Sequence, residues 1–155
     1  MNNSIGRKYL LHEVPAHITP DPEGNVFFIT IGCAERGTVQ LTKDPVWKSL
    51  LETLLFRESN GEIHVRLLLA MPDHLHGLFV FSGSKPMKET IRNFKTWMTK
   101  KHQIKWERGF FEHRIRSWES GFQKGEYIRN NPVRAGLVSH RDDWKYVYDP
   151  INLKG

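Results

Sequence analysis

Two adjacent apolar runs near the middle of the chain restrict its fold more than any other feature. Residues 63–71 and 76–81 are rich in branched and aromatic side chains, and Pro72-Asp73 between them is typical of a turn. This pattern predicts two buried antiparallel strands joined as a hairpin. We therefore expect a sheet with this hairpin at its centre.

A strand and a helix are predicted before the hairpin. Residues 26–32 form a β-branched and aromatic run, which predicts a first strand. Asp44 followed by Pro45 predicts a helix start, because aspartate caps free amides and proline suits the first helical position. Apolar residues at helical spacing then extend this helix to about Arg57.

Two further helices are predicted after the hairpin. The first begins at Pro86 and runs to about His102, with an apolar stripe on its inner face. The second covers about residues 118–130 and ends before Pro132. Residues 106–116 mix aromatic and charged side chains and fit either a short edge strand or an ordered loop.

The order of these elements predicts the fold class. It reads strand, helix, strand, strand, helix and then a fourth strand if residues 106–116 supply one. That is the order of a ferredoxin-like, split βαβ sandwich of the α+β class with a central antiparallel sheet.

Composition narrows the classes of partner. The chain has 155 residues, a formal net charge of +6 and a pI of about 9.5. A chain of this length accommodates one domain, and its positive charge favours a polyanionic partner, either nucleic acid or an anionic membrane surface. Residues 1–24 are basic and rich in proline, which predicts an irregular N-terminal arm.

Two absences in the sequence exclude other classes. No apolar stretch reaches the roughly 18 residues that a membrane-spanning helix needs, so we expect no membrane association. Cys33 is the only cysteine, which excludes an intrachain disulfide and a cysteine-rich zinc site. We therefore expect a cytoplasmic protein.

His74 and His76 form a pair with metal-binding potential at the start of the second hairpin strand. Side chains alternate along a strand, so the two imidazoles point the same way with Cβ atoms about 6.5–7 Å apart. So placed, they can share one metal ion. Taken alone, the pair more often represents partnered polar residues at a sheet edge.

Tyr127 and Asn131 form a second pair. Their spacing of four residues at the end of a predicted helix places a phenol and an amide oxygen on one helix face. The alternative is an ordinary tyrosine followed by an asparagine that ends the helix. Glu126 is a candidate accessory ligand or base, or else a solvated glutamate, and His113 is a candidate contact to metal or DNA, or else a structural histidine.

The two pairs together fit the chemistry of a phosphodiester. Divalent ions stabilise charge on phosphoryl and leaving oxygens, and histidine with oxygen ligands can hold such an ion. A tyrosine phosphate ester retains the bond energy that rejoining needs, so strand transfer requires no ATP.

Basic residues interleaved with aromatic ones suit a groove that follows a nucleic-acid backbone while bases stack on rings. The alternative is a solvated positive face above a core of aromatic residues. The candidate DNA contacts are Arg92, Lys95, Arg114, Arg116, Arg129 and Arg134.

Three motifs in this order carry a family resemblance. They are MPDHLHGL at 71–78, GFFEHRIR at 109–116 and EYIRNNPVRAGLV at 126–138. The chain resembles the REP-associated tyrosine transposases, relatives of the single-tyrosine insertion-sequence transposases. The likeness covers about residues 25–140, so we expect a transposase domain there and a C-terminal tail over 141–155.

The resemblance implies a function and its residues. It implies the HUH nuclease fold, His74, His76 and Asn131 as ligands of Mg²⁺ or Mn²⁺, and Tyr127 as the nucleophile. It also implies a single-stranded DNA substrate with a hairpin formed by a repetitive extragenic palindrome (REP) and a short guide sequence. The expected intermediate is a 5′-phosphotyrosine with a free 3′ hydroxyl, and a monomer is expected although insertion-sequence relatives are dimers.

Other functions remain open at this point. A non-catalytic DNA-binding protein derived from such a transposase would keep the fold without the reaction. A replication initiator or relaxase would share the chemistry, but 155 residues leave no room for the usual accessory domains. A metal-dependent hydrolase would cut DNA without a covalent step.

Overall fold

The computed structural model describes residues 26–81 and 84–150, and five strands within them form one antiparallel sheet. The strands follow one another across the sheet in the order β4-β1-β3-β2-β5. Their bounds are β1 Val26–Gly32, β2 Ile63–Met71, β3 His74–Phe81, β4 Phe111–Arg114 and β5 Val147–Tyr148. The helices are α2 Asp44–Ser59, α3 Met87–His102, α4 Trp118–Arg129 and α5 Asn131–Arg134, with a 3₁₀ turn η3 at Arg141–Asp143.

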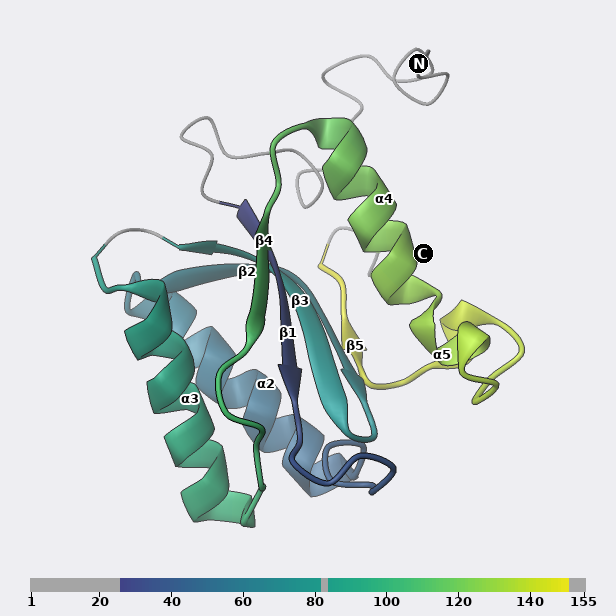
Figure 1. Cartoon of the computed structure of the whole chain (residues 1–155), viewed down its shortest axis with the longest axis horizontal. Helices are drawn as coiled ribbons and strands as arrows, with labels where there is room; N and C mark the ends of the chain where they lie inside the picture. The colour runs from purple at the N-terminus through teal and green to yellow at the C-terminus, as the bar shows by residue number, and fades with distance from the viewer. Residues whose placement is uncertain (1–25, 82–83, 151–155) are drawn as a thin grey trace.

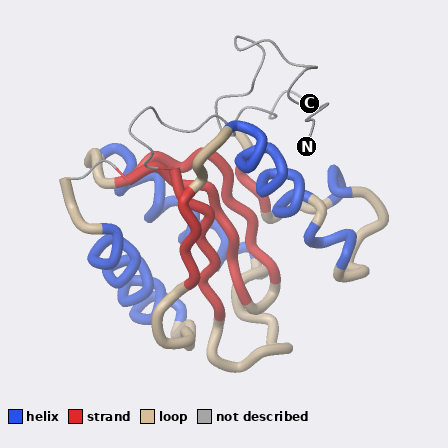
Figure 2. Tube along the Cα trace, turned by 45° about the horizontal axis from the view of Figure 1, so that its top comes forward, coloured by secondary structure: helices blue, strands red, loops and turns tan. Residues whose placement is uncertain are grey.

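The connections confirm the predicted ferredoxin-like α+β fold. β1 leads through α2 to β2, and β3 lies between these two strands; β3 in turn leads through α3 to β4, with β1 between them. Helices α2 and α3 lie together on one face of the sheet, and α4 lies on the other (Figures 1 and 2). The hairpin of β2 and β3 stands next to the centre, as its apolar runs predict.

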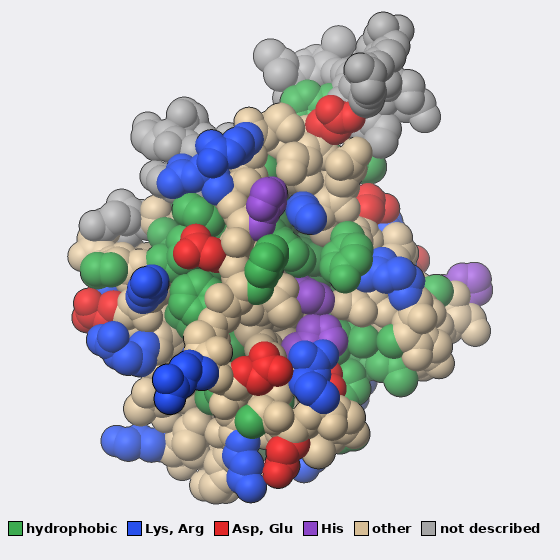
Figure 3. All heavy atoms as spheres, viewed as in Figure 1, with side chains coloured by type: hydrophobic (Ala, Val, Ile, Leu, Met, Phe, Trp, Pro, Cys, Tyr) green, Lys and Arg blue, Asp and Glu red, His purple; other side chains and the backbone are tan. Residues whose placement is uncertain are grey.

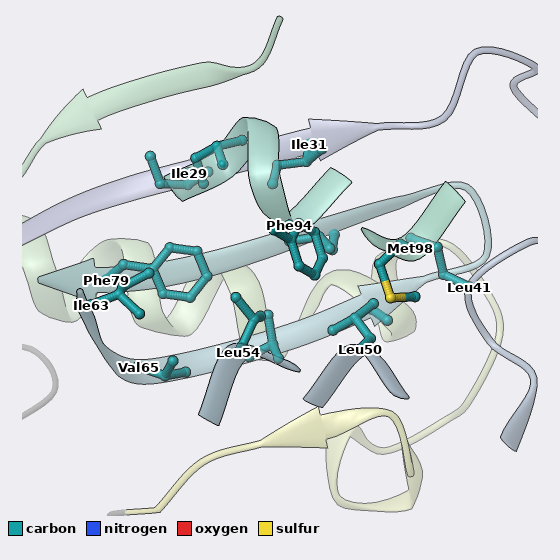
Figure 4. Close-up of a cluster of buried hydrophobic side chains, with 14 of the residues drawn as sticks. Ile29, Ile31, Leu41, Leu50, Leu54, Ile63, Val65, Phe79, Phe94 and Met98 are labelled. Carbon is teal, nitrogen blue, oxygen red and sulfur yellow. The ribbon is translucent and has the colours of Figure 1, made fainter. Parts of the chain in front are cut away.

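The main core fills the space between the sheet and helices α2 and α3. Alternate residues of the central strands, such as Ile29 and Phe79, point to this face and are 0% and 1% exposed. They meet helix residues at helical spacing, including Leu50, Leu54 and Phe94 (Figure 4). The opposite strand residues form a smaller cluster that includes Phe28, Leu78 and Ile128 of α4.

Two details of the predicted elements need correction or completion. Helix α2 has Lys43 rather than Asp44 as its N-cap, and it extends to Ser59. The Asp44 carboxylate instead accepts hydrogen bonds from Tyr146 (2.9 Å) and Lys145 (3.2 Å), which join the helix start to the C-terminal segment. The undecided stretch 106–116 contains an edge strand, because β4 pairs with β1.

Part of the segment expected as a C-terminal tail packs on the sheet. β5 pairs with β2, and the Trp144 indole N–H donates to the Ala70 carbonyl at 3.0 Å. The predicted arm over residues 1–24 lies outside the described residues. Within residues 26–81 and 84–150, no helix has the length and apolarity that crossing a membrane requires.

Gly77 occupies a place in β3 where a side chain would collide with the core. A Cβ there would overlap the ring of Phe79, which is buried. We expect Gly77→Ala to destabilise the fold by about 1–3 kcal/mol, the usual effect of overpacking. Urea unfolding followed by circular dichroism would measure the change in the free energy of unfolding. Gly37→Ala is the comparison for backbone strain alone, because φ is +86° there and a Cβ would contact no other atom.

Candidate active site

A pocket of about 630 Å³ opens on the sheet face that carries α4. It collects residues that are far apart in the sequence, from β1 to α5. Histidine side chains lie near the middle of the face shown in Figure 3, beside hydrophobic and cationic ones. Its lining consists of Phe28, Thr30, Arg36, His74, His76, Phe111, Lys124, Tyr127 and Asn131. All four residues of the two predicted pairs therefore line one pocket.

The alternation of β3 brings the two histidines together. The ring centroids of His74 and His76 are 4.8 Å apart, with the rings nearly perpendicular. His76 is only 5% exposed. Burial, followed by the nearby charges of His74, Arg134 and Arg36, lowers the pKa of His76 to about 3, so its imidazole is neutral at pH 7.

Each histidine uses its Nδ1 atom in a hydrogen bond. Nδ1 of His76 lies 2.8 Å from the hydroxyl of Thr30, the residue opposite it in the sheet. Nδ1 of His74 lies 2.8 Å from a carboxylate oxygen of Asp73. A carboxylate can only accept a hydrogen bond, so His74 donates from Nδ1. The other ring nitrogen, Nε2, is then the one that could bind a metal ion. A carboxylate bonded to Nδ1 is the usual support of a metal-binding histidine.

Asp73 is itself held in place from the loop after β1. It accepts hydrogen bonds from the Gly37 backbone N–H (2.7 Å) and from Nε of Arg36 (3.0 Å). Partial burial alone would raise the pKa of Asp73, but the bonds from Gly37, His74 and Arg36 outweigh it and bring the pKa to about 2. The carboxylate is therefore ionised at neutral pH and orients the His74 ring.

Tyr127 enters the pocket from α4, which Ser117 caps by accepting a hydrogen bond from the Ser120 N–H. The Tyr127 ring is 47% exposed and its centroid lies 5.9 Å from that of His76. The Arg134 guanidinium stands 4.0 Å from the centre of the ring and donates to the Tyr127 carbonyl at 2.9 Å. The phenol is thus accessible, and a hydrogen bond from Arg134 joins the C-terminal end of α4 to α5.

Asn131 reaches the pocket by a route that differs slightly from the expected one. Helix α4 ends at Arg129, and Asn131 is the first residue of the separate short helix α5, in which Pro132 follows at once. Proline cannot continue the α4 hydrogen-bond ladder, which explains the break. Asn131 still lines the same pocket as Tyr127.

Several lining residues were not predicted as part of the site. Thr30 and Phe28 alternate with core residues of β1, and their strand lies beside the histidine strand, but only the sheet register reveals this. Lys124 lies one helical turn before Tyr127, and its ammonium is 5.1 Å from the Phe28 ring centre. That helical spacing was a usable signal. Arg36 comes from a loop, where no local pattern marks it.

Comparisons with known proteins bear on the family resemblance and on the fold. No protein-family model matches the chain. A REP-associated tyrosine transposase from Escherichia coli is 24% identical over 127 residues, covering 80% of this chain and 76% of that protein. A solved REP-associated tyrosine transposase bound to a REP hairpin superposes with a TM-score of 0.71 at 23% identity, again covering 80% and 76%. The resemblance to these transposases is confirmed. Their HUH fold, predicted from the motifs, is confirmed with it.

One more relative has no assigned function. An uncharacterized protein from Haemophilus influenzae is 29% identical over 100 residues, covering 46% of this chain and 56% of that protein. It extends the sequence likeness without adding a function to it.

Arg129, predicted as a DNA contact, is buried in an ion pair instead. It is 7% exposed, and its Nε donates to a carboxylate oxygen of Asp149 at 2.6 Å. Glu126, a candidate ligand or base, is likewise occupied: its oxygens pair with Arg129 at 3.2 Å and with Arg141 at 2.6 Å. Partners from the C-terminal segment thus bury the charge of Arg129 away from DNA, and they pair Glu126 as the alternative of an ordinary glutamate predicts.

None of the other predicted contacts lines the pocket, although Arg134 packs against the ring of Tyr127. Arg92 and Lys95 line a second groove next to α3. The Arg114 guanidinium lies 4.9 Å from the Phe27 ring centre, and Arg116 is exposed. His113 is exposed on β4 and does not line the pocket.

The pocket lining offers two imidazoles and one amide as potential donors to a metal ion. Over residues 26–81 and 84–150, no three histidine, cysteine, aspartate or glutamate side chains form a metal-binding group. Among the lining residues, the imidazoles of His74 and His76 and the side-chain amide of Asn131 are the groups that could hold a metal ion. A mixed nitrogen and oxygen set of this kind fits a divalent ion that keeps positions for phosphate oxygens and water.

Proposed function

We propose that this chain is a metal-dependent DNA strand transferase that cuts and rejoins single-stranded DNA. The supporting observation is that one pocket contains the histidine pair of β3 together with Tyr127 and Asn131. The substrate we propose is single-stranded DNA that forms a REP hairpin, because a relative with this fold was solved with a REP hairpin bound.

His74, His76 and Asn131 would hold Mg²⁺ or Mn²⁺. Bound there, the ion would stabilise negative charge on the phosphoryl oxygens and on the leaving 3′ oxygen. Thr30 and Asp73 orient the two imidazoles through hydrogen bonds to Nδ1. Burial keeps the His76 imidazole uncharged, so it can bind a cation.

Tyr127 supplies the nucleophile in this proposal. Its phenolic oxygen attacks phosphorus, the bond from phosphorus to the 3′ oxygen breaks, and the phenol proton ends on that oxygen through solvent. The products are a tyrosine ester of the 5′ phosphate and a free 3′ hydroxyl. Attack by a 3′ hydroxyl on the ester reverses the step and rejoins DNA.

Side chains around the active-site pocket favour the binding of a DNA strand. Lys124, Arg134 and Arg36 place positive charge around the pocket mouth and attract phosphates. Phe111 is 57% exposed and meets the Phe28 ring edge to face at 6.0 Å, so it offers an apolar surface to a base. The pocket thus offers positive charge to the backbone and one apolar surface to a base.

A denaturing adduct assay tests the proposal. The protein would be incubated with a hairpin-forming oligonucleotide and Mn²⁺, denatured, and separated by electrophoresis, with the label on the 5′ or the 3′ end. We expect protein-linked DNA carrying the 3′ label only. Cleavage without an adduct would indicate a hydrolase, and binding without cleavage would indicate a non-catalytic DNA-binding protein.

Thr30→Val should weaken the response to metal without disturbing the fold. The change keeps the side-chain shape and removes the hydroxyl that bonds His76. Loss of such a supporting bond costs about 10–100-fold in metal affinity, so half-maximal adduct formation should need correspondingly more Mn²⁺.

A matched control for Thr30→Val exists in the same chain. Ser49→Ala also removes a hydroxyl 2.8 Å from a histidine nitrogen, that of His102, but this bond joins α2 to α3. It should leave the Mn²⁺ dependence unchanged. Equal metal dependence in Thr30→Val and the parent would exclude Thr30 as a support of the proposed ligand.

A further inference from the structure

A second, larger groove lies on the other face of the sheet from the candidate active site. It measures about 890 Å³ and runs between α3 and residues 104–112. Ile91 and Ile104 are buried at its base, and Trp106 and Phe110 are partly buried along it. The groove therefore offers apolar and aromatic surface rather than a simple patch of charge.

Cations surround this apolar surface. Lys88, Arg92, Lys100 and Lys105 are exposed lining residues, and they form no ion pair with any residue that the structure describes. Lys and Arg side chains are seen on the α3 side of the molecule in Figure 3. Glu107 and Glu112 are the acidic lining residues. The excess of positive charge suits a polyanion.

The wall of the groove is held in a fixed shape by hydrogen bonds. The Lys95 ammonium donates to the carbonyls of Glu107 (2.9 Å) and Gly109 (2.8 Å), and the Trp106 indole N–H donates to the Lys95 carbonyl at 3.1 Å. Thr99 donates to the Ile104 carbonyl at 2.7 Å. The ammonium of Lys95, which was predicted as a DNA contact, thus holds the backbone of residues 107–109 against α3. The groove is therefore formed without a ligand.

The edge strand β4 separates the groove from the candidate active site. Phe111 lines the active-site pocket, whereas Phe110 and Glu112 on either side of it line the groove. This follows from the alternation of side chains along a strand. No described strand pairs with the free side of β4. A flexible chain that crosses this edge can occupy both cavities.

We propose that the groove binds an unpaired stretch of the DNA whose reacting phosphate lies in the active-site pocket, an inference that rests on the proposed function. Single-stranded DNA offers base faces to Trp106 and Phe110 and phosphates to the surrounding cations. A duplex keeps its base faces stacked and would leave the apolar surface unused. The groove therefore selects a single strand and extends the contact beyond the site of cleavage.

Fluorescence anisotropy without divalent metal tests the groove. The Tyr127→Phe protein, which cannot be captured covalently, would bind single strands of about 6 and about 20 nucleotides, and a duplex of the longer length. We expect the longer single strand to bind most tightly. Arg92→Ala with Lys100→Ala should remove most of that gain and lower the salt slope by about 1.4, since each lost phosphate contact accounts for about 0.7.

The control removes equal charge elsewhere. Lys43→Ala with Lys48→Ala changes two exposed lysines at the start of α2 that line neither cavity, and it should keep the salt slope. Equal losses in the two double variants would overturn the proposal, because they would show a general charge effect. A duplex that bound as tightly as the single strand, with the same dependence on Arg92 and Lys100, would also overturn it.

The adduct assay separates this proposal from the proposed function. With Tyr127 intact, the groove variant should still form adduct with the short strand and lose the advantage of the long one. If no strand forms an adduct but the anisotropy results hold, the strand-transfer function fails and the groove stands as a single-strand binding site. If adducts form and strand length has no effect, the groove proposal fails alone.

Discussion

Tyr127→Phe is expected to abolish protein-linked DNA while leaving the fold and DNA binding intact. The change removes one oxygen, and no hydrogen bond to that oxygen joins Tyr127 to another described residue. The ring contacts with Phe28, His76 and Arg134 are kept. Because the phenolic oxygen is the atom that would bond to phosphorus, its loss should lower adduct formation below detection, whereas circular dichroism and hairpin binding should match the parent.

Tyr148→Phe is the control for this experiment. Tyr148 lies on β5 and packs against the main core, away from the pocket lining. Its loss of a hydroxyl should leave adduct formation unchanged. Adduct that persists in Tyr127→Phe and disappears in Tyr148→Phe would move the nucleophile to the other tyrosine; adduct that persists in both would point to a different residue type.

Asp149→Ala is expected to destabilise the fold by about 3 kcal/mol. Removing one partner of a buried ion pair costs about 3–5 kcal/mol, since the other charge stays buried without compensation. The lower figure applies because Glu126 still pairs with Arg129. Urea unfolding would measure the change, and adduct formation should fall as well, because Tyr127 is two residues from Arg129 on α4.

Two comparison variants make the Asp149 experiment specific. Asp142→Ala removes an exposed aspartate in η3 and should change stability little. Replacing both partners, Arg129→Met with Asp149→Leu, removes the buried charges together and should recover much of the lost stability. A full loss in the double variant would mean that packing, rather than an uncompensated charge, underlies the effect.

The sequence was a good guide where a local period determines the outcome. The hairpin of β2 and β3 follows from two apolar runs around Pro72-Asp73, and α3 follows from apolar residues at helical spacing. His74 and His76 share a face because strands alternate. These features depend on neighbours along the chain, so periodicity is sufficient to predict them.

The failures concern pairings between distant residues. Arg129 was expected to face DNA, yet its partner Asp149 lies 20 residues later. Asp44 was expected to cap α2, yet it bonds Lys145 and Tyr146 about 100 residues away. A charged residue at the end of a helix is solvated or buried according to what the rest of the chain brings to it. No local pattern contains that information.

The two halves of the candidate site are anchored differently. β3, which carries the histidines, is paired with β1 on one side and β2 on the other, whereas α4 rests on the sheet by one face. Local opening begins where burial and pairing are least, so amide hydrogens of α4 should exchange with deuterium before those of β3. In the proposed reaction, such opening would let Tyr127 move with a bound strand while the histidine pair keeps its place in the sheet.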